Sequence, residues 1–274
     1  MAYGGIRPSY RVTRRLLCEH SQHQEIMIFE TPVFGRMLVL DGIVQVAEKD
    51  EFIYHEMMTH VPFVAHGNVL HVLVIGGGDG GILREVLKHN IRRATLVEID
   101  QQVITRCREF MPFLSNGAFG DKRTNLVIGD GMKYISTTDD KFDVIIVDST
   151  DRLGPGRALY TPSFYRNCQR CLNPEGILVN QNGVPFLYPD HITLTYRRRR
   201  KYFSTTSLFV VAIPSLHGGL FAFGWATNSR KARQVSDTNI RRRYVAAKLG
   251  TKYYTPEMHR ACFALPPFVQ NCLR

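Results

Sequence analysis

The sequence contains no long uninterrupted hydrophobic run, and its N-terminus does not show a charged stretch followed by an apolar one. Because a helix that crosses a bilayer needs about 20 consecutive apolar residues, we expect no membrane association and a cytoplasmic protein. Cysteine is also sparse, with 6 residues in 274. Cys168 and Cys171 form the single C-x-x-C pair, and no second pair or histidine pair accompanies it. We therefore expect free thiols and no metal site.

Acidic residues are fewer than basic ones, at 24 against 35, which gives a formal net charge of +11. A balance of this kind suggests a nucleic acid or an acidic surface as partner. The excess is concentrated in residues 7–15, 197–201 and 230–243. The run 197–201 lies in a predicted helix, and a solvated helix face is its simplest interpretation. No nucleic-acid-binding motif is present, so such a partner is not expected.

Two units are predicted, a small antiparallel β domain at residues 1–50 and a larger catalytic domain at 51–274. Strands are predicted at 25–29, 35–40 and 43–46, and Asp41-Gly42 is a typical hairpin turn between the last two. Residues 1–23 are basic and have no clear pattern. A helix is predicted over 51–64, with Asp50 as its N-cap.

The stretch 71–81 combines an apolar β-branched run with a glycine-rich turn, and a helical pattern follows it. Strand, glycine turn and helix together form the opening of a nucleotide-binding α/β unit. Further strands are predicted at 94–99, 125–128, 142–148, 176–180, 207–213 and 220–225. The last two are joined by a segment too short for a crossover helix, so they should pair antiparallel. The prediction is an α/β fold, a class I S-adenosylmethionine-dependent methyltransferase-like Rossmann sheet.

Carboxylates follow four consecutive parallel strands of this predicted sheet: Asp79, Glu98, Asp130 and Asp148. Ligands of such sheets bind outside the carboxyl ends of the strands. Asp79 would repel a pyrophosphate, which disfavours NAD and FAD and favours a cationic nucleoside such as a sulfonium compound. Glu98 is placed to accept ribose hydroxyls. Asp148 and Asp151 can converge on one amine, which one of them holds while the other removes its proton.

Several motifs resemble bacterial spermidine synthase, a polyamine aminopropyltransferase. They are DGIVQVAEKDEFIYHEMMTHVP, VLVIGGGDGG, LVEID, IGDG, DSTD followed by GPG, and YYTPEMHRACFALP. The resemblance runs from about residue 24 to about residue 270. It implies transfer of an aminopropyl group from decarboxylated S-adenosylmethionine to putrescine, which yields spermidine and methylthioadenosine. It also implies a homodimer or homotetramer and no cofactor besides this co-substrate.

The resemblance further implies roles for individual residues. Asp148 would be the proton acceptor, and Asp79 would contact the amine of the aminopropyl arm. Asp79 would also select against intact S-adenosylmethionine, which carries a carboxylate there. The nucleoside would be held by Gln24, Glu98, Asp130, Gly131 and Pro155, and the diamine channel would be lined by Gln45, Tyr54, His55, Asp148 and Asp151.

The sequence departs from the family pattern at several positions. The usual tryptophan-containing opening is missing, Arg152 follows Asp151 in place of proline, and Arg157 and Leu216 stand where the family often has an acid and a tyrosine. Arg157 and Leu216 could therefore change acceptor choice. Two alternatives stay open at this point: an aminopropyl- or methyltransferase for a different amine, and a degenerate basic homologue that binds nucleic acid.

Overall fold

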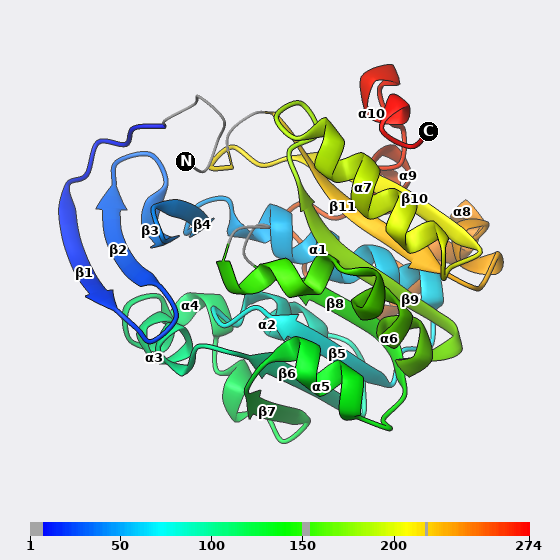
Figure 1. The fold of residues 1–274 in the computed structure, drawn as a ribbon, viewed down its shortest axis with the longest axis horizontal. Coiled ribbons are helices and arrows are strands. Elements are labelled where there is room, and N and C mark those ends of the chain that lie inside the picture. The colour runs from blue at the N-terminus through cyan, green and yellow to red at the C-terminus, as the bar shows by residue number, and fades with distance from the viewer. Residues whose placement is uncertain (1–7, 150–153, 217–218) are drawn as a thin grey trace.

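The computed structural model describes residues 8–149, 154–216 and 219–274, and it contains two β-sheets (Figure 1). The smaller sheet has four antiparallel strands in the order β1-β2-β3-β4. Asp41 and Gly42 both have positive φ angles, 49° and 76°, as the predicted two-residue hairpin turn requires. The strands are β1 (Arg14–His20), β2 (Glu25–Thr31), β3 (Gly35–Leu40) and β4 (Ile43–Ala47).

Strand β1 was not predicted, because residues 1–23 showed no alternating pattern. It is an edge strand whose side chains are mostly exposed, and its register with β2 shifts between Arg15 and Leu17. An edge strand with a bulge buries too few side chains to impose period-two alternation on the sequence. Its pairing with β2 is instead supported from outside, by an ion pair of 2.8 Å between Glu19 and Arg106 of α3.

The larger sheet has seven strands in the order β10-β11-β9-β8-β5-β6-β7. β5 to β9 pair in parallel, whereas β11 pairs antiparallel with both β9 and β10. This arrangement confirms the predicted α/β fold class. The strands are β5 (His71–Gly76), β6 (Arg93–Glu98), β7 (Thr124–Ile128), β8 (Phe142–Asp148), β9 (Leu172–Gly183), β10 (Thr205–Ala212) and β11 (Leu220–Thr227).

Helices cover both faces of the larger sheet, so its central strands are apolar on both sides. In β5, Val72 and Val74 belong to the core that includes side chains of α1 and α2, whereas Leu73 and Ile75 pack with α5 and α6. The helices are α1 (Glu51–His66), α2 (Gly81–Leu87), α3 (Gln101–Phe110), α4 (Pro112–Ser115), α5 (Gly131–Thr137), α6 (Pro162–Cys171), α7 (Pro189–Arg200), α8 (Asp237–Ala247), α9 (Pro256–Ala261) and α10 (Pro267–Asn271), with 3-10 turns η1 (Ala118–Gly120), η2 (Gly154–Tyr160) and η3 (Lys231–Arg233). No helix in these described ranges is long and apolar enough to cross a membrane.

The small sheet packs against the larger unit through one of its faces. Ile26, Ile28 and Leu38 share a core with Val103 of α3 and Leu114 of α4. A fully buried aliphatic side chain stabilises by about 1.5–3 kcal/mol relative to an exposed one, so this contact fixes the sheet in place. The small sheet therefore forms a wall beside the carboxyl ends of the parallel strands.

Helix α1 begins where it was predicted, but Asp50 does not cap it. The Asp50 side chain makes no capping hydrogen bond. Its carboxylate instead accepts hydrogen bonds from the backbone N–H of Ser215 at 2.7 Å and from its hydroxyl at 2.9 Å. The hydroxyl of Tyr10 donates to the carbonyl of Ser215 at 3.1 Å. Sequence reasoning missed this, because a partner 165 residues away leaves no local signal.

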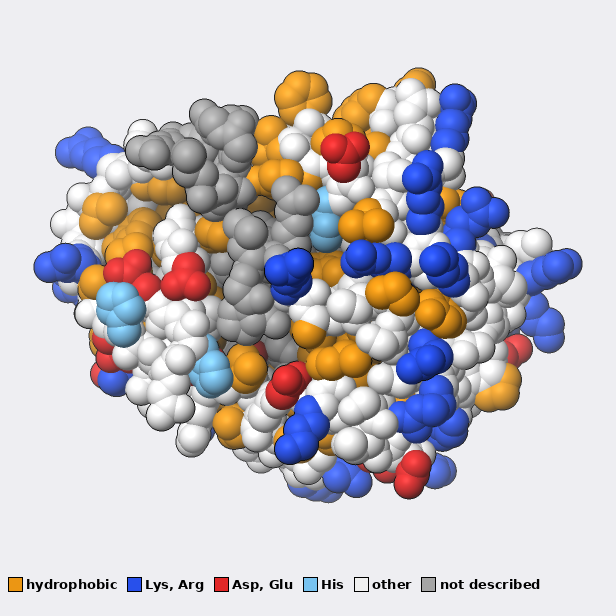
Figure 2. Space-filling model, in the orientation of Figure 1, with side chains coloured by type: hydrophobic (Ala, Val, Ile, Leu, Met, Phe, Trp, Pro, Cys, Tyr) orange, Lys and Arg blue, Asp and Glu red, His pale blue; other side chains and the backbone are white. Residues whose placement is uncertain are grey.

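The basic run at the end of α7 is not a uniformly solvated face, as had been interpreted. Arg199 is completely buried, and its Nη1 donates to the side-chain oxygens of Asn180 and Asn182 at 3.1 Å each. Arg198 donates to the carbonyl of Tyr160 at 2.7 Å. Lys and Arg side chains do gather over α5, α6 and α7 in Figure 2. The run is thus partly structural, because it fastens α7 to the sheet and to η2.

Candidate active site

The glycine-rich turn after β5 makes room for side chains of this chain itself. Gly76 and Gly77 have φ angles of 80° and 72°, which favour glycine. A Cβ on Gly77 would lie 3.2 Å from Oδ2 of Asp148, and one on Gly81 would lie 2.2 Å from the His55 ring. The sequence had suggested that these glycines admit a ligand. In the structure they also allow the acidic and imidazole groups to approach the turn.

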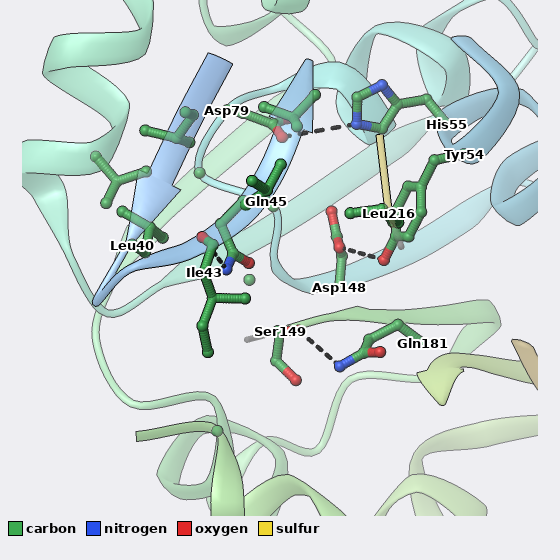
Figure 3. Close-up of a pocket in the computed structure, with 18 of the residues that line it drawn as sticks. Leu40, Ile43, Gln45, Tyr54, His55, Asp79, Asp148, Ser149, Gln181 and Leu216 are labelled. Atoms are coloured by element: carbon green, nitrogen blue, oxygen red, sulfur yellow. Dashed lines mark hydrogen bonds and ion pairs between the residues drawn. The ribbon is translucent and has the colours of Figure 1, made fainter. Parts of the chain in front are cut away.

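The acids that follow the four parallel strands line one cavity. Asp79, Glu98, Asp130 and Asp148 come from the ends of β5, β6, β7 and β8, and all four lie in its wall. The small sheet supplies the opposite wall, with Leu40, Ile43 and Gln45 among its lining side chains (Figure 3). The predicted convergence of these carboxylates is therefore present in the structure.

Asp148 and Asp79 lie close to each other at the centre of the cavity. One carboxylate oxygen of each, together with a ring nitrogen of His55, lie within 4.8 Å of one another. The hydroxyl of Tyr54 donates to Oδ1 of Asp148 at 2.6 Å (Figure 3). Two carboxylates at this spacing can hold and deprotonate one amine. The sequence predicted this chemistry for Asp148 with Asp151, and Asp151 lies outside the described residues.

The pKa values of the two carboxylates are shifted in opposite directions. Burial, and secondarily the charge of Asp79, raises the pKa of Asp148 to about 6. Burial acts against ionisation of Asp79 as well, but the nearby His55 outweighs it and leaves the pKa of Asp79 below its ordinary value. Near neutral pH, Asp79 is thus a fixed anion, and Asp148 is a base whose pKa lies close to working pH.

His55 contacts an acidic side chain on each side. Its Nδ1 lies 2.5 Å from Oε2 of Glu51, and its Nε2 lies 3.6 Å from Oδ2 of Asp79. Burial alone would lower the pKa of His55, but Asp79 and Glu51 together raise it to about 10. The ring is therefore an imidazolium with both nitrogens turned to carboxylates. This geometry favours an indirect role in diamine binding over direct contact with a second cation.

Glu98 is buried at the end of β6 and stands beside Gly78. Its Oε1 accepts the backbone N–H of Asp100 at 2.9 Å. Burial raises the pKa of Glu98 to about 7. A Cβ on Gly78 would come within 3.1 Å of its Oε2, so this oxygen also needs the glycine turn. Gln24 lies in the cavity wall as well, and its amide donates to Oδ2 of Asp100 at 3.1 Å.

Asp130 and Gly131 begin α5 at the edge of the same cavity. Oδ1 of Asp130 accepts the N–H of Met132 at 2.7 Å and of Lys133 at 3.3 Å, as an N-cap does. The capping interaction leaves the second carboxylate oxygen available. Asp151 and the side chain of Pro155 lie outside the described residues, so the structure does not place these two predicted site residues.

Sequence reasoning missed several lining residues. Gln181, at the end of β9, donates to the carbonyl of Ser149 at 3.1 Å and to the hydroxyl of Tyr160 at 2.7 Å. The strand-end argument used for the first four parallel strands would have found it at the fifth. Glu51 and Ser215 also line the cavity, and no role was predicted for either. Leu216 contributes an apolar wall near Tyr54 (Figure 3).

Comparison with known proteins identifies the family of this chain. The family model described as "Spermine/spermidine synthase domain" matches residues 51–236, and the "Spermidine synthase tetramerisation domain" matches residues 2–48. The chain belongs to the spermine/spermidine synthase family. The resemblance seen in the sequence motifs is thereby confirmed.

Members of this family share most of their length with the chain. Polyamine aminopropyltransferases of Salmonella arizonae and Shigella sonnei are each 48% identical to it over 265 residues, which are 96% of this chain and 93% and 92% of those proteins. A spermidine synthase solved with the transition-state analogue AdoDATO has a TM-score of 0.91 and 38% identity, and the one from Thermotoga maritima has a TM-score of 0.90 and 38% identity. Each alignment covers 96% of this chain and 89% of the solved one.

Proposed function

We propose that this protein transfers the aminopropyl group of decarboxylated S-adenosylmethionine to putrescine, which yields spermidine and 5′-methylthioadenosine. One observation carries the proposal: in a chain of this family, Asp79 and Asp148 converge with Tyr54 and His55 in a single cavity. Both reactants are cationic, and closely placed carboxylates stabilise such charges far better than bulk surface groups do.

Asp148 is proposed as the general base of the transfer. An ammonium group has no lone pair, so the acceptor amine must lose a proton before it attacks. Asp148 would take that proton, and the freed nitrogen would displace the sulfur from the adjacent carbon of the propyl arm. The C–S electron pair stays on sulfur, which becomes a neutral thioether. The hydroxyl of Tyr54, 2.6 Å from Asp148, holds the carboxylate in place.

Asp79 is proposed to bind the terminal amine of the aminopropyl arm. It stays ionised because its pKa is lowered, chiefly by His55 against the effect of burial. Intact S-adenosylmethionine would place its own carboxylate beside this anion, and two like charges in a buried site are costly. Asp79 would thus choose between the two donors.

The nucleoside part is proposed to lie at the other end of the cavity. Glu98 would accept the ribose hydroxyls with Oε2, while Gln24 and the turn at Asp130 and Gly131 would flank the base. These assignments rest on the motif positions together with the shared cavity wall. Pro155 and Asp151 keep their sequence-based roles as predictions.

The length of the acceptor is a further part of the proposal. Leu216 presents an apolar surface to the cavity, whereas Arg157 is exposed on η2. A leucine cannot hydrogen-bond a distal amine, so we expect a looser preference among diamines than a polar side chain would impose. Turnover of 1,3-diaminopropane, putrescine, cadaverine and spermidine, compared in one panel, measures that preference.

The decisive experiment supplies purified protein with decarboxylated S-adenosylmethionine and putrescine. Mass spectrometry should detect spermidine and methylthioadenosine in equal amounts, and intact S-adenosylmethionine should be a poor donor. Methylation of the amine instead of aminopropyl transfer would favour the alternative methyltransferase. No turnover, combined with salt-dependent binding of RNA or DNA, would favour the basic homologue that binds nucleic acid.

We further propose a cytoplasmic homo-oligomer. All six cysteines are free thiols, as is usual in a reducing compartment. The match of residues 2–48 to a tetramerisation domain supports assembly of several copies. The proposed units at 1–50 and 51–274 are consistent with the two matched segments.

A further inference from the structure

We propose that Glu51 is a positioning residue of this site: anchored by Arg84, it keeps the His55 ring charged and turned to Asp79, and through that charge it keeps Asp148 ionised. This inference rests on the proposed aminopropyl transfer, in which Asp148 accepts the proton. It adds to the site a glutamate and an arginine that no motif assigned.

An unbroken line of ionic contacts runs from the cavity into the protein. From Asp79 it passes to His55 at 3.6 Å, then to Glu51 at 2.5 Å, and from Glu51 to Nη2 of Arg84 at 2.8 Å. The same oxygen, Oε2 of Glu51, contacts both the ring and the guanidinium. Glu51 is 8% exposed and His55 is 1% exposed, so water screens these contacts poorly.

Arg84 is itself held rigidly on α2. Its Nε contacts Glu85 at 2.8 Å, and its Nη1 donates to the carbonyls of Phe113 at 3.2 Å and Leu114 at 2.8 Å. The carbonyl groups belong to α4, so Arg84 ties α1, α2 and α4 together. A guanidinium with a hydrogen bond from each of its three nitrogens fixes the carboxylate of Glu51 geometrically.

The His55 ring is closely packed between α2 and Tyr54. It packs against the first residue of α2, where a Cβ on Gly81 would lie 2.2 Å from the ring. Tyr54 contacts it edge-on from the same helix, with ring centroids 5.6 Å apart. In this packing, the contacts of its two nitrogens are with Glu51 on one side and with Asp79 on the other.

The charge of the ring follows from the groups that face it. Carboxylates approach from the glycine turn (Asp79) and from its own helix (Glu51), and together they outweigh burial, so that the pKa of His55 reaches about 10. Other charged or titratable groups around this centre are Asp148 at the end of β8, Glu98 at the end of β6, Asp50 before α1, Tyr54 on α1 and Cys107 on α3.

The imidazolium acts on Asp148 by its charge. Burial and Asp79 raise the pKa of Asp148 to about 6, and His55 works in the opposite direction. If His55 lost its proton, the pKa of Asp148 would rise further, and less of it would be ionised at neutral pH. Glu51 therefore influences the base through the charge of His55.

The test uses Glu51→Gln, which keeps the shape of the side chain and removes its charge. We expect the acidic limb of the kcat profile to move up by about 1 pH unit, so that activity near pH 6.5 falls roughly 3-fold more than activity near pH 9. In the same variant, NMR of the His55 ring in the free protein should show deprotonation well below pH 9. The wild-type ring should remain protonated there.

Glu56→Gln is the matched control. Glu56 is also a buried glutamate of α1, but its carboxylate accepts the backbone N–H groups of Lys252, Tyr253 and Tyr254, each at 2.8 Å. The carboxylates that contact the His55 ring are instead Glu51 and Asp79. The Glu56→Gln substitution should lower thermal stability, but the acidic limb of the kcat profile and the pKa of the His55 ring should stay as in the wild type. This separates a loss of structure from a loss of positioning.

A double-mutant cycle excludes a direct effect of Glu51 on Asp148. His55→Gln should produce the same upward shift of the acidic limb, and the addition of Glu51→Gln should shift it no further. The proposal is overturned if the two shifts add, if the limb does not move in Glu51→Gln, or if the ring stays charged in that variant. If Glu51→Gln does not fold, Glu51→Asp serves instead, since its shorter side chain withdraws the carboxylate from the ring.

The NMR titration needs no substrate. If the His55 ring loses its proton in Glu51→Gln but the wild-type protein shows no aminopropyl transfer, the proposed function is refuted and the Glu51–His55 link is retained. If aminopropyl transfer occurs but the acidic limb of Glu51→Gln is unchanged, the proposed function is retained and the role of Glu51 is refuted.

Discussion

At the scale of single residues, neighbours determine which side chains in the cavity carry a charge. Asp79 and Asp148 are both buried aspartates, but the pKa of Asp79 is lowered by His55 and that of Asp148 is raised to about 6 by burial. Residue type and strand-end position predicted where these groups would lie. Their opposite shifts depend on the burial of Asp148 and on the contact of Asp79 with His55, whose position comes from the packing of α1 against the sheet.

Substitution of Asp148 by Asn should lower kcat by roughly 10²- to 10⁴-fold, because the amide cannot accept the proton of the acceptor amine. Binding of methylthioadenosine should be almost unchanged, since that ligand does not need the base. Steady-state kinetics and calorimetry measure the two effects. Turnover near the wild-type value would remove Asp148 from the role of base.

Substitution of Asp79 by Ala should narrow the discrimination between decarboxylated and intact S-adenosylmethionine. The variant loses both an attraction for the ammonium group and a repulsion of the carboxylate. Competition between the two donors in one reaction, with products separated by mass, gives the ratio. A donor ratio equal to that of the wild type would contradict the role of Asp79.

Binding of methylthioadenosine should weaken as the pH falls below about 7. Hydroxyl donors favour the ionised carboxylate of Glu98, and its pKa of about 7 in the free protein means that protons compete with the ribose below that pH. Affinity at pH 6 should be about 10-fold lower than at pH 8. Calorimetry at both values measures it, and Glu98→Gln should flatten the dependence. A pH-independent affinity in the wild type argues against the Glu98–ribose contact.

At the scale of elements, the site depends on how closely helices α1 and α2 approach each other. The His55 ring of α1 lies against Gly81 at the start of α2, where no Cβ fits. The glycine turn is thus as important for packing between helices as for space around a ligand.

Gly81→Ala should lower both activity and stability, because the added methyl group must displace the ring or separate the helices. Overpacking of this kind typically costs about 1–3 kcal/mol. Gly120→Ala is the control, since a Cβ there meets nothing within 4 Å. Chemical denaturation and kcat measure the two effects. If the two variants have the same stability and the same kcat, the His55 ring can move away from position 81 at little cost.

The sequence predicted most elements because the central strands are apolar on both faces and their helices are regular. It missed β1, an exposed edge strand, and the true partner of Asp50, which lies far along the chain. It also interpreted Arg199 as solvated, although this residue is fully buried against Asn180 and Asn182. These cases share a cause: long-range contacts decide them, and local patterns carry no trace of such contacts. The boundary between residues 50 and 51 stays a prediction.

At the scale of the whole molecule, the net charge of +11 and the acidic cavity have opposite signs. Basic side chains gather over α5, α6 and α7 (Figure 2), whereas the carboxylates are inside. Long-range repulsion of a cationic reactant is screened within about a Debye length at physiological salt, and the local acids then dominate.

The protein should be larger than its 31.3 kDa chain in solution. Within the described part of the chain, the edge strand β1 has no strand partner on one side, and Val12 and Val33 are 48% and 68% exposed. Such an edge is suited to association with another copy. Size-exclusion chromatography with light scattering gives the mass directly. A monomer at micromolar concentration would contradict the expected homo-oligomer.

The N-terminal part of the chain contributes directly to the site, so a truncated protein should lose part of the cavity. The hydroxyl of Tyr10, for example, donates to the carbonyl of Ser215. Gln24 and the lining of β3 and β4 come from the same N-terminal part. A shortened chain that begins at residue 51 would keep the acids at the strand ends. It would lack the small sheet, so these acids would be exposed to solvent on that side. The acids of the site and the β-sheet wall that faces them thus lie on opposite sides of residue 50 in the sequence.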